Sequence, residues 1–176
     1  MAENLTKIIE VPPEVTADVS GFVLKASGEK GSIEKELIYP GVSMKKEGSS
    51  IVFESKNTRK EFKAIIGTYS AHLKNMIKGV SEGFEYTLKV VFTHFPITLK
   101  EEKGVVEIHN FYGEKVPRKA KILEGVDVDL QKDQVIVSGI DKESVGQTAS
   151  NIQNATKVKG RDTRIFQDGI YVVSKK

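Results

Sequence analysis

The 176-residue sequence predicts an α+β fold of two similar modules from an internal duplication, each an antiparallel or mixed sheet packed by one helix. Three observations support this prediction. The same order of apolar and turn patterns occurs twice, and each occurrence includes one amphipathic helical pattern. The strand patterns also lack the regular strand–helix–strand alternation that is typical of parallel sheets. An apolar share of 39% and a charged share of 29% are ordinary for a folded domain.

The internal repeat is visible in three pairs of segments. "VSMKKEGSSIVF" (42–53) and "VDVDLQKDQVIV" (126–137) each place an apolar alternation before a polar turn and a second short strand. Gly67 and Gly146 occupy matching helical positions, each preceded and followed by aliphatic residues at the same spacing. A Gly-Glu-Lys triplet lies upstream in both halves. Because the three matches occur in the same order, we interpret them as two homologous modules.

In the first module, apolar alternation between glycine and charged turns predicts strands at 21–26, 32–37, 42–44 and 51–54. The helix that follows has apolar residues spaced three and four apart between Phe62 and Ile77. Thr58 and Glu61 have the spacing of a capping box, which predicts the start of this helix. Gly79 predicts its end.

In the second module, the same pattern predicts strands at 86–92, 97–99, 105–110, 116–120, 126–130 and 135–139. A helix is expected to begin near Asp141. Its apolar stripe includes Val145, Thr148, Ala149 and Ile152, most of them small residues that let a helix approach its sheet closely.

These elements predict a first module at 1–82, a second module at 83–156 and a basic C-terminal extension at 157–176 that packs on or near the second module. The extension contains six basic and two acidic side chains, a net charge of +4, whereas the whole protein has a net charge of +3. The positive charge is therefore concentrated at one end of the chain, which indicates an anionic partner.

Several classes of function lack the residues that they need. The absence of cysteine excludes disulfides, thiolate nucleophiles and cysteine-based zinc sites. His72, His94 and His109 lack the spacing of a metal motif, and no nucleophile elbow or phosphate-binding glycine loop occurs. We expect no catalytic site, metal, cofactor or small-molecule substrate. No apolar run could span a bilayer and the N-terminus has no signal pattern, so we expect an intracellular, cytoplasmic protein without a membrane partner.

The extension has the composition of an RNA-binding segment. Basic residues recur through "KVKGRDTRIFQDGIYV" (157–172), and the polar residues between them can reach phosphate or sugar oxygens. The predicted RNA-binding residues are Lys157, Lys159, Gly160, Arg161, Thr163, Arg164 and Gln167. Possible additional contacts are Lys115, Arg118, Lys119 and Asn154.

Two other functions fit parts of the same pattern. A protein–protein adaptor built from two β-rich modules would use the basic tail to contact an acidic partner, and its main contact surface would be a large exposed apolar patch. A hydrolase would use His94 or His109 with a nearby carboxylate, and it would need a concave pocket that holds this histidine.

Long ungapped segments resemble a known family. "VIVSGIDKESVGQTASNIQ" (135–153) looks like the signature of large-subunit ribosomal protein family six, and "GRDTRIFQDGIYV" (160–172) resembles the C-terminal segment of its archaeal and eukaryotic form. "VPPEVTADVSG" (11–21) and "TYSAHLKNMIKGVSEGFEY" (68–86) are similar too, so the resemblance covers nearly the entire chain.

The resemblance implies a duplicated, non-catalytic structural protein of the ribosome. Its second module and basic tail would bind large-subunit ribosomal RNA near the factor-binding region, which includes the sarcin–ricin loop. The family's RNA-contacting tail falls on the same seven residues of 157–167 that the charge pattern identifies. The first module has 12 basic and 11 acidic residues over 1–83, and this balance suggests a module available to neighbouring ribosomal proteins.

Overall fold

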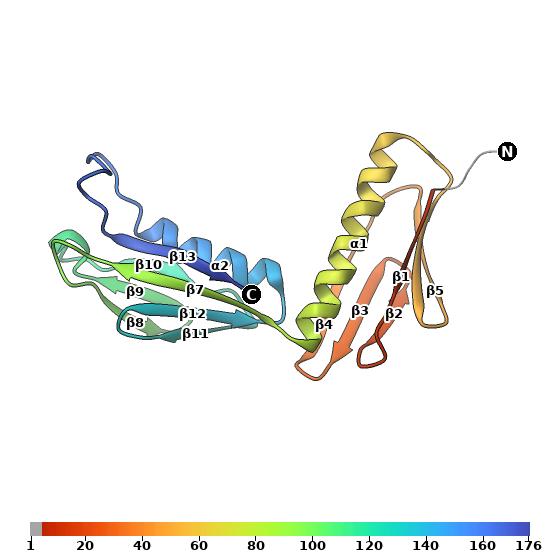
Figure 1. The fold of residues 1–176 in the computed structure, drawn as a ribbon, viewed down its shortest axis with the longest axis horizontal. Coiled ribbons are helices and arrows are strands. Elements are labelled where there is room, and N and C mark those ends of the chain that lie inside the picture. Colours follow the sequence, from red (N-terminus) through yellow and green to blue (C-terminus); the bar gives the residue numbers. More distant parts are fainter. Residues whose placement is uncertain (1–4) are drawn as a thin grey trace. The chain divides into compact units, whose positions relative to one another are not determined.

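The computed structural model describes residues 5–176 and divides into two units, Met1–Gly83 and Phe84–Lys176, which we describe separately. Each unit combines antiparallel sheets with one helix (Figure 1). The predicted α+β fold with one helix per module is therefore confirmed. No helix among the described residues is long and apolar enough to cross a membrane.

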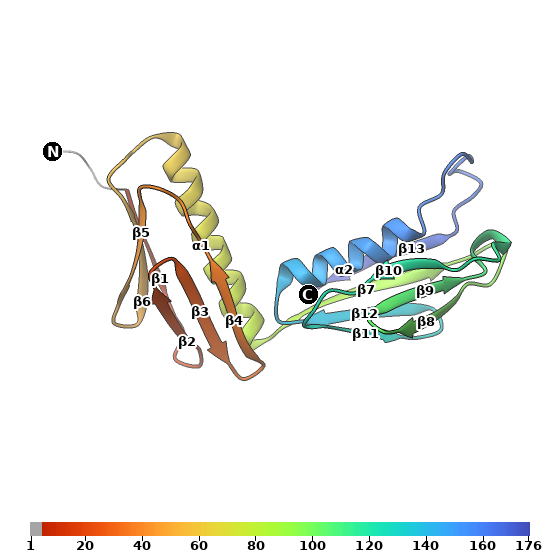
Figure 2. The ribbon, with the colours of Figure 1, turned by 180° about the vertical axis from the view of Figure 1, so that it is seen from behind.

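The first unit contains two three-stranded antiparallel sheets, in the orders β1-β6-β5 and β2-β3-β4. The strands are β1 (Leu5–Glu10), β2 (Thr16–Ser20), β3 (Val23–Gly28), β4 (Gly31–Glu36), β5 (Val42–Glu47) and β6 (Ser50–Ser55). The helix α1 (Lys60–Ser81) packs on strands of both sheets (Figure 2). Leu24, Ile51, Phe53 and Leu73 are fully buried and form the core of this unit.

The predicted capping box at the start of α1 is wrong. The N-cap is Arg59, and its side chain makes no capping hydrogen bond. Glu61 instead accepts a hydrogen bond from the hydroxyl of Tyr39, which lies 22 positions away in the sequence. The Asn57 carboxamide accepts a hydrogen bond from the Arg59 N–H at 3.2 Å. Because Glu61 is engaged in this tertiary contact with Tyr39, it does not form the capping box.

The predicted stop at Gly79 is also wrong. Gly79 is buried within the helix, which continues to Ser81. The Lys78 carbonyl then accepts hydrogen bonds from the N–H groups of Glu82 (2.8 Å) and Gly83 (3.2 Å). Gly83 has a φ of 78°, a left-handed conformation that glycine adopts without steric strain. The helix therefore ends at Ser81, and Gly83, the second of the two glycines, reverses the chain just beyond its C-cap.

The second unit contains a four-stranded antiparallel sheet, in the order β11-β12-β7-β13, and a three-stranded sheet, in the order β10-β9-β8. Its elements are β7 (Phe84–Val91), β8 (Thr98–Glu102), β9 (Val105–His109), the short 3₁₀ helix η1 (Phe111–Gly113), β10 (Arg118–Lys121), β11 (Val126–Leu130), β12 (Gln134–Gly139), the helix α2 (Lys142–Ala155) and β13 (Gly169–Lys175). Leu88, Val106, Ile108, Val137 and Ile152 are fully buried in its core.

The helix α2 begins where the sequence predicts. The Asp141 carboxylate is the N-cap and accepts hydrogen bonds from the N–H groups of Glu143 (3.2 Å) and Ser144 (3.1 Å). The predicted apolar stripe is buried against the sheets. A Cβ on Gly139 would lie 2.9 Å from a Val145 methyl carbon, so the close approach of helix and sheet requires glycine at this position.

The two units share a strand order, and one strand distinguishes them. The order β1-β6-β5 in the first unit corresponds to β7-β12-β11 in the second, and β2-β3-β4 corresponds to β8-β9-β10. The second unit adds β13 on the outer edge of β7, whereas β1 has no strand on its outer edge among residues 5–176. The duplication is therefore visible in the topology, and β13 is an addition to the second copy.

Three strands, β1, β2 and β13, are not predicted from the sequence. Most side chains of β1 and β2 are exposed, and Pro12 and Pro13 lie between these strands. In β13, Ile170 pairs with Val90, and Val172 with Leu88, before a bulge shifts the register. The bulge interrupts the two-residue alternation that would predict this strand. The last residues of the predicted extension therefore belong to the main sheet of the second unit.

Ile170 and Val173 form a matched pair to test the contribution of β13. Ile170 is fully buried, whereas Val173 is 67% exposed. We expect Ile170→Ala to lower the free energy of unfolding of the second unit by about 2–5 kcal/mol, because it leaves a cavity in the core. Val173→Ala should change it by less than about 0.5 kcal/mol. Urea unfolding followed through second-unit amide resonances measures both values. Equal effects of the two substitutions would contradict the assignment of β13 to the core of the second unit.

Candidate nucleic-acid interface

Residues 157–168, which we call the basic loop, connect α2 to β13. Figure 1 shows this loop at one end of the second unit, where β7 ends and η1 lies. The loop carries Lys157, Lys159, Arg161 and Arg164, and all four are exposed. Four basic residues therefore lie on one loop that is fastened to the fold at both ends.

Thr156 joins the two ends of the basic loop. Its side chain is buried, and its hydroxyl donates to the Gln153 carbonyl at 3.0 Å. The same hydroxyl oxygen accepts a hydrogen bond from the Ile170 N–H at 3.0 Å. One side chain thus connects the end of α2 to the beginning of β13.

Arg118 supports the start of the basic loop from β10. Its guanidinium donates to both carboxylate oxygens of Glu114, at 2.8 and 2.7 Å, and to the carbonyls of Ala155 (3.0 Å) and Lys157 (3.3 Å). It also lies over the Phe111 ring, 4.3 Å from the centroid. The hydrogen bond from Arg118 lowers the pKa of the Glu114 carboxyl. The hydrogen-bond donors of Arg118 are therefore directed mainly to groups within the protein.

Asp168 holds the other end of the basic loop. Its carboxylate accepts hydrogen bonds from the Thr93 N–H at 2.6 Å, the His94 N–H at 3.4 Å and the His94 ring Nδ1 at 3.0 Å. Asp168 is only 2% exposed. Burial alone raises the pKa of its carboxyl, but the hydrogen bonds from His94 and Thr93 outweigh burial and hold the pKa below its usual value. The loop is thereby fixed to the β7–β8 connection.

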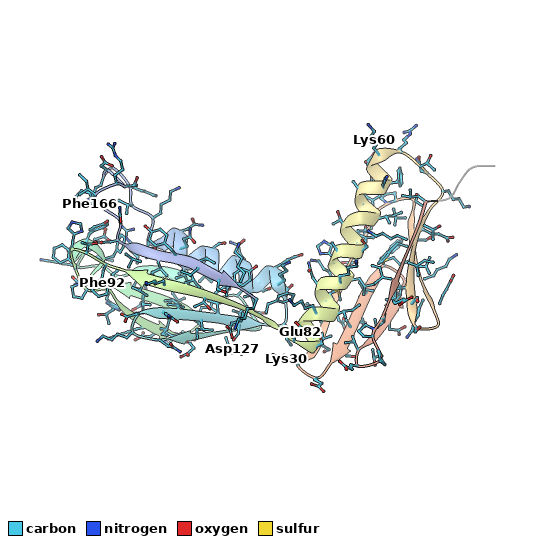
Figure 3. All side chains as sticks on the ribbon, in the orientation of Figure 1. Lys30, Lys60, Glu82, Phe92, Asp127 and Phe166 are labelled. Carbon is cyan, nitrogen blue, oxygen red and sulfur yellow. The ribbon has the colours of Figure 1, made fainter. Side chains whose placement is uncertain are left out.

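Phe166 and Arg161 of the basic loop form a cluster with the rings of His94 and Tyr112. The Phe166 ring stacks on the His94 ring, with centroids 5.0 Å apart, and meets the Tyr112 ring edge-on at 5.7 Å. The Arg161 guanidinium lies 4.9 Å from the centroids of both Tyr112 and Phe166. Figure 3 shows Phe166 at the end of the second unit. The cluster therefore orients Arg161 before any ligand binds.

Tyr112 adopts a strained backbone conformation within this cluster. Its φ is 52°, a left-handed value that is unusual for a bulky residue. Such a conformation costs about 1–3 kcal/mol and persists only where the surroundings hold it. The contacts of Tyr112 with Phe111, Phe166 and Arg161 provide that support.

A polar hollow of about 210 Å³ lies between the loop and η1. It is lined by Tyr112, Glu114, Arg118, Val158, Lys159 and Arg161. Glu114 is paired with Arg118, so Lys159 and Arg161 give the hollow an excess of positive charge. The arrangement is suited to an anionic group, and a phosphate is the anion that such donors commonly bind.

The remaining predicted residues lie in different settings. Arg164 is 87% exposed at its side chain and donates to Asp162 at 2.8 Å, so its charge is partly neutralised. The Gln167 side chain donates to the Arg164 carbonyl at 3.0 Å. Gly160 has a φ of 70° and is exposed, as is Thr163.

The four possible additional contacts also lie in different environments. Lys115, in the connection between η1 and β10, and Asn154, near the end of α2, are both exposed. Lys119 forms an ion pair with Glu107 at 3.0 Å. Only Arg118 is used to hold the loop, so the structure gives it a positioning role.

The two histidines of the hydrolase hypothesis both lie beside carboxylates. His94 is bound to Asp168, and the His109 ring Nε2 lies 3.4 Å from a Glu107 carboxylate oxygen. No group of three or more His, Asp or Glu side chains among residues 5–176 is placed to hold a metal ion. Sequence reasoning did not identify the clamp of Thr93, His94 and Asp168, because its members are about 75 positions apart in the chain.

Comparison with known proteins identifies the family. A family model described as Ribosomal protein L6 matches the chain twice, over residues 11–83 and 96–169. The chain belongs to the ribosomal protein L6 family. The two matches confirm the duplication that the sequence and the topology indicate. Membership of this family of structural proteins also confirms that the chain is not an enzyme.

Archaeal relatives match along the whole chain. A protein of Methanothrix thermoacetophila is 46% identical over 176 residues, which cover 100% of both chains. A protein of Methanococcus vannielii is 53% identical over 99% of this chain and 96% of the relative, and one of Methanocella arvoryzae is 47% identical over 99% of each. All three are described as large ribosomal subunit protein uL6.

The Asp168 clamp predicts a specific pH dependence. Because the folded-state pKa of Asp168 lies below its usual value of 3.8, the carboxylate stabilises the second unit at neutral pH. This stabilisation should be lost as the pH falls through the folded-state pKa. Asp168→Asn should lower the free energy of unfolding at pH 7 by about 1–3 kcal/mol and flatten its decline below about pH 4.

Urea unfolding at a series of pH values measures this effect. Asp127→Asn, at an exposed position on β11, is the matched control and should retain the wild-type pH profile. If the free energy of unfolding of Asp168→Asn falls with acid in parallel with that of the wild type, the clamp is not the source of the decline in the wild type.

Proposed function

We propose that this chain is a structural protein of the large ribosomal subunit in the cytoplasm, and that its second unit and basic loop bind large-subunit ribosomal RNA. The family match and the printed names of the archaeal relatives support this proposal. The RNA-binding residues are Lys157, Lys159, Gly160, Arg161, Thr163, Arg164 and Gln167, with Lys115, Lys119 and Asn154 as further contacts.

The observation that carries the proposal is the hollow between the loop and η1. Lys159 and Arg161 line it, and Arg161 is oriented by the rings of Tyr112 and Phe166. A guanidinium that is already held in place loses little conformational freedom when it binds a phosphate. Its planar fork also matches two phosphate oxygens at once.

The form of the loop favours recognition of RNA by shape. The wide minor groove of an RNA helix presents phosphates and 2′-hydroxyls, which polar and basic side chains on a projecting loop can reach. Thr163 and Gln167 are exposed beside the basic residues and can contact sugar hydroxyls. The contacts would be numerous but not specific for base sequence.

We further propose a position near the factor-binding region that includes the sarcin–ricin loop, with neighbouring ribosomal proteins as additional partners. The C-terminal motif at 160–172 supports this position. The first unit, with 12 basic and 11 acidic residues over 1–83, has the charge balance of a surface that contacts proteins.

The salt dependence of binding to large-subunit ribosomal RNA tests the function. Each phosphate contact that is lost should reduce the slope of log affinity against log salt by about 1. We expect Lys159→Gln and Arg161→Gln each to weaken binding and to reduce the slope. Lys100→Gln, an exposed lysine on β8, is the matched control and should leave both unchanged.

Charge substitutions are preferable to truncation here, because removal of the C-terminal segment would also remove β13 from the sheet. If the loop variants and wild type bind with equal slopes, the loop does not contact RNA. The protein–protein adaptor then becomes the better hypothesis.

Asp162 allows a substitution that should strengthen RNA binding rather than weaken it. Its carboxylate accepts hydrogen bonds from Arg164 and repels phosphate. Asp162→Asn removes one negative charge and weakens the hold on Arg164, so we expect tighter RNA binding, especially at low salt. The same binding assay measures this effect. Unchanged or weaker binding would show that Arg164 does not meet a phosphate.

A further inference from the structure

We propose that Phe92 and Phe95 form a stacking site for unpaired bases of the RNA that the basic loop binds. This inference rests on the proposed RNA-binding function. Both residues lie on the connection between β7 and β8, residues 92–97, which we call the aromatic turn. Neither belongs to the sites that the sequence and the family resemblance identify.

The exposure of these two side chains requires an explanation. Phe92 is 43% exposed and Phe95 is 44% exposed, although phenyl rings are usually buried. Figure 3 shows Phe92 at the same end of the second unit as Phe166 of the basic loop. Two large apolar side chains are thus presented to solvent beside a loop that carries four basic residues.

The aromatic turn is held in place from both sides. Asp168 of the basic loop binds Thr93 and His94, as described above. The Asn110 side chain donates to the Pro96 carbonyl at 3.0 Å. The Phe95 ring lies against Gly113, where a Cβ would be 3.6 Å from the nearest ring atoms. A turn fixed in this way presents its phenyl rings with little loss of conformational entropy on binding.

The charge around the turn favours RNA as the occupant. Single-stranded nucleic acid is bound by aromatic rings that stack on bases, together with basic side chains that contact the backbone. Asp168 and the stacked pair of His94 and Phe166 connect the aromatic turn directly to the basic loop. Unpaired bases in RNA loops and bulges are the targets that such an arrangement fits.

The two parts of the surface should respond differently to substitution, and this difference is the test. Phe92→Leu and Phe95→Leu keep an apolar side chain but remove the aromatic face. We expect each to weaken binding to transcribed large-subunit ribosomal RNA by about 5- to 150-fold, the range for loss of one base stack. The salt slope should not change, because no charge is removed.

Phe22→Leu is the matched control. Phe22 is 50% exposed in the first unit, and its substitution should not alter RNA affinity. Thermal unfolding of each variant establishes that the second unit remains folded, and aromatic NMR resonances of Phe92 and Phe95 should shift upfield when RNA binds to the wild type.

Each outcome decides a different question. Wild-type RNA affinity for both phenylalanine variants would overturn the stacking site while leaving the proposed function intact. A reduced salt slope in Phe95→Leu would also overturn it, because the ring would then only position the basic loop. Normal RNA affinity with impaired incorporation into ribosomal particles would assign the turn to a protein contact. Absence of salt-dependent RNA binding by the wild type would instead contradict the proposed function itself.

Discussion

The pairing of β13 with β7 is the constraint on which the basic end of the molecule depends. It makes the segment between α2 and β13 a loop closed at both ends rather than a free tail. A closed loop has far fewer conformations than a tail, so less entropy opposes the ordering of its side chains. Thr156, Arg118 and Asp168 then determine the path of the loop at its start and end.

At this end of the second unit, some charged side chains stabilise the fold and others face the hollow. Arg118 and Asp168 are ionisable, yet both have their hydrogen-bonding groups satisfied by nearby partners and serve the fold. Lys159 and Arg161 are left to face the hollow. The charged residues at this end of the second unit therefore divide into those that hold the loop in place and those that remain available to a ligand.

Much of the architecture was predictable because its signals are local. The periodicity of α1 and α2, the Asp141 cap and the repeated strand pattern each depend on residues a few positions apart. The errors arose where distant residues compete. Tyr39 takes Glu61 from the capping box, and β13 depends on pairing with β7 across a long stretch of chain. The basic residues of the loop were recognisable from composition, but their support by His94 and Tyr112 was not, because it depends on contacts between segments distant in sequence.

The bulge in β13 has a consequence for the free protein. An unpaired strand at the edge of a sheet can serve as a template for a strand of another molecule. In β13, the register shifts between Val172 and Ser174, and Lys175 and Lys176 follow. The irregular ladder and the repulsion between like charges make this edge a poor template. The β13 edge is thereby disfavoured as a site of edge-to-edge pairing with another molecule.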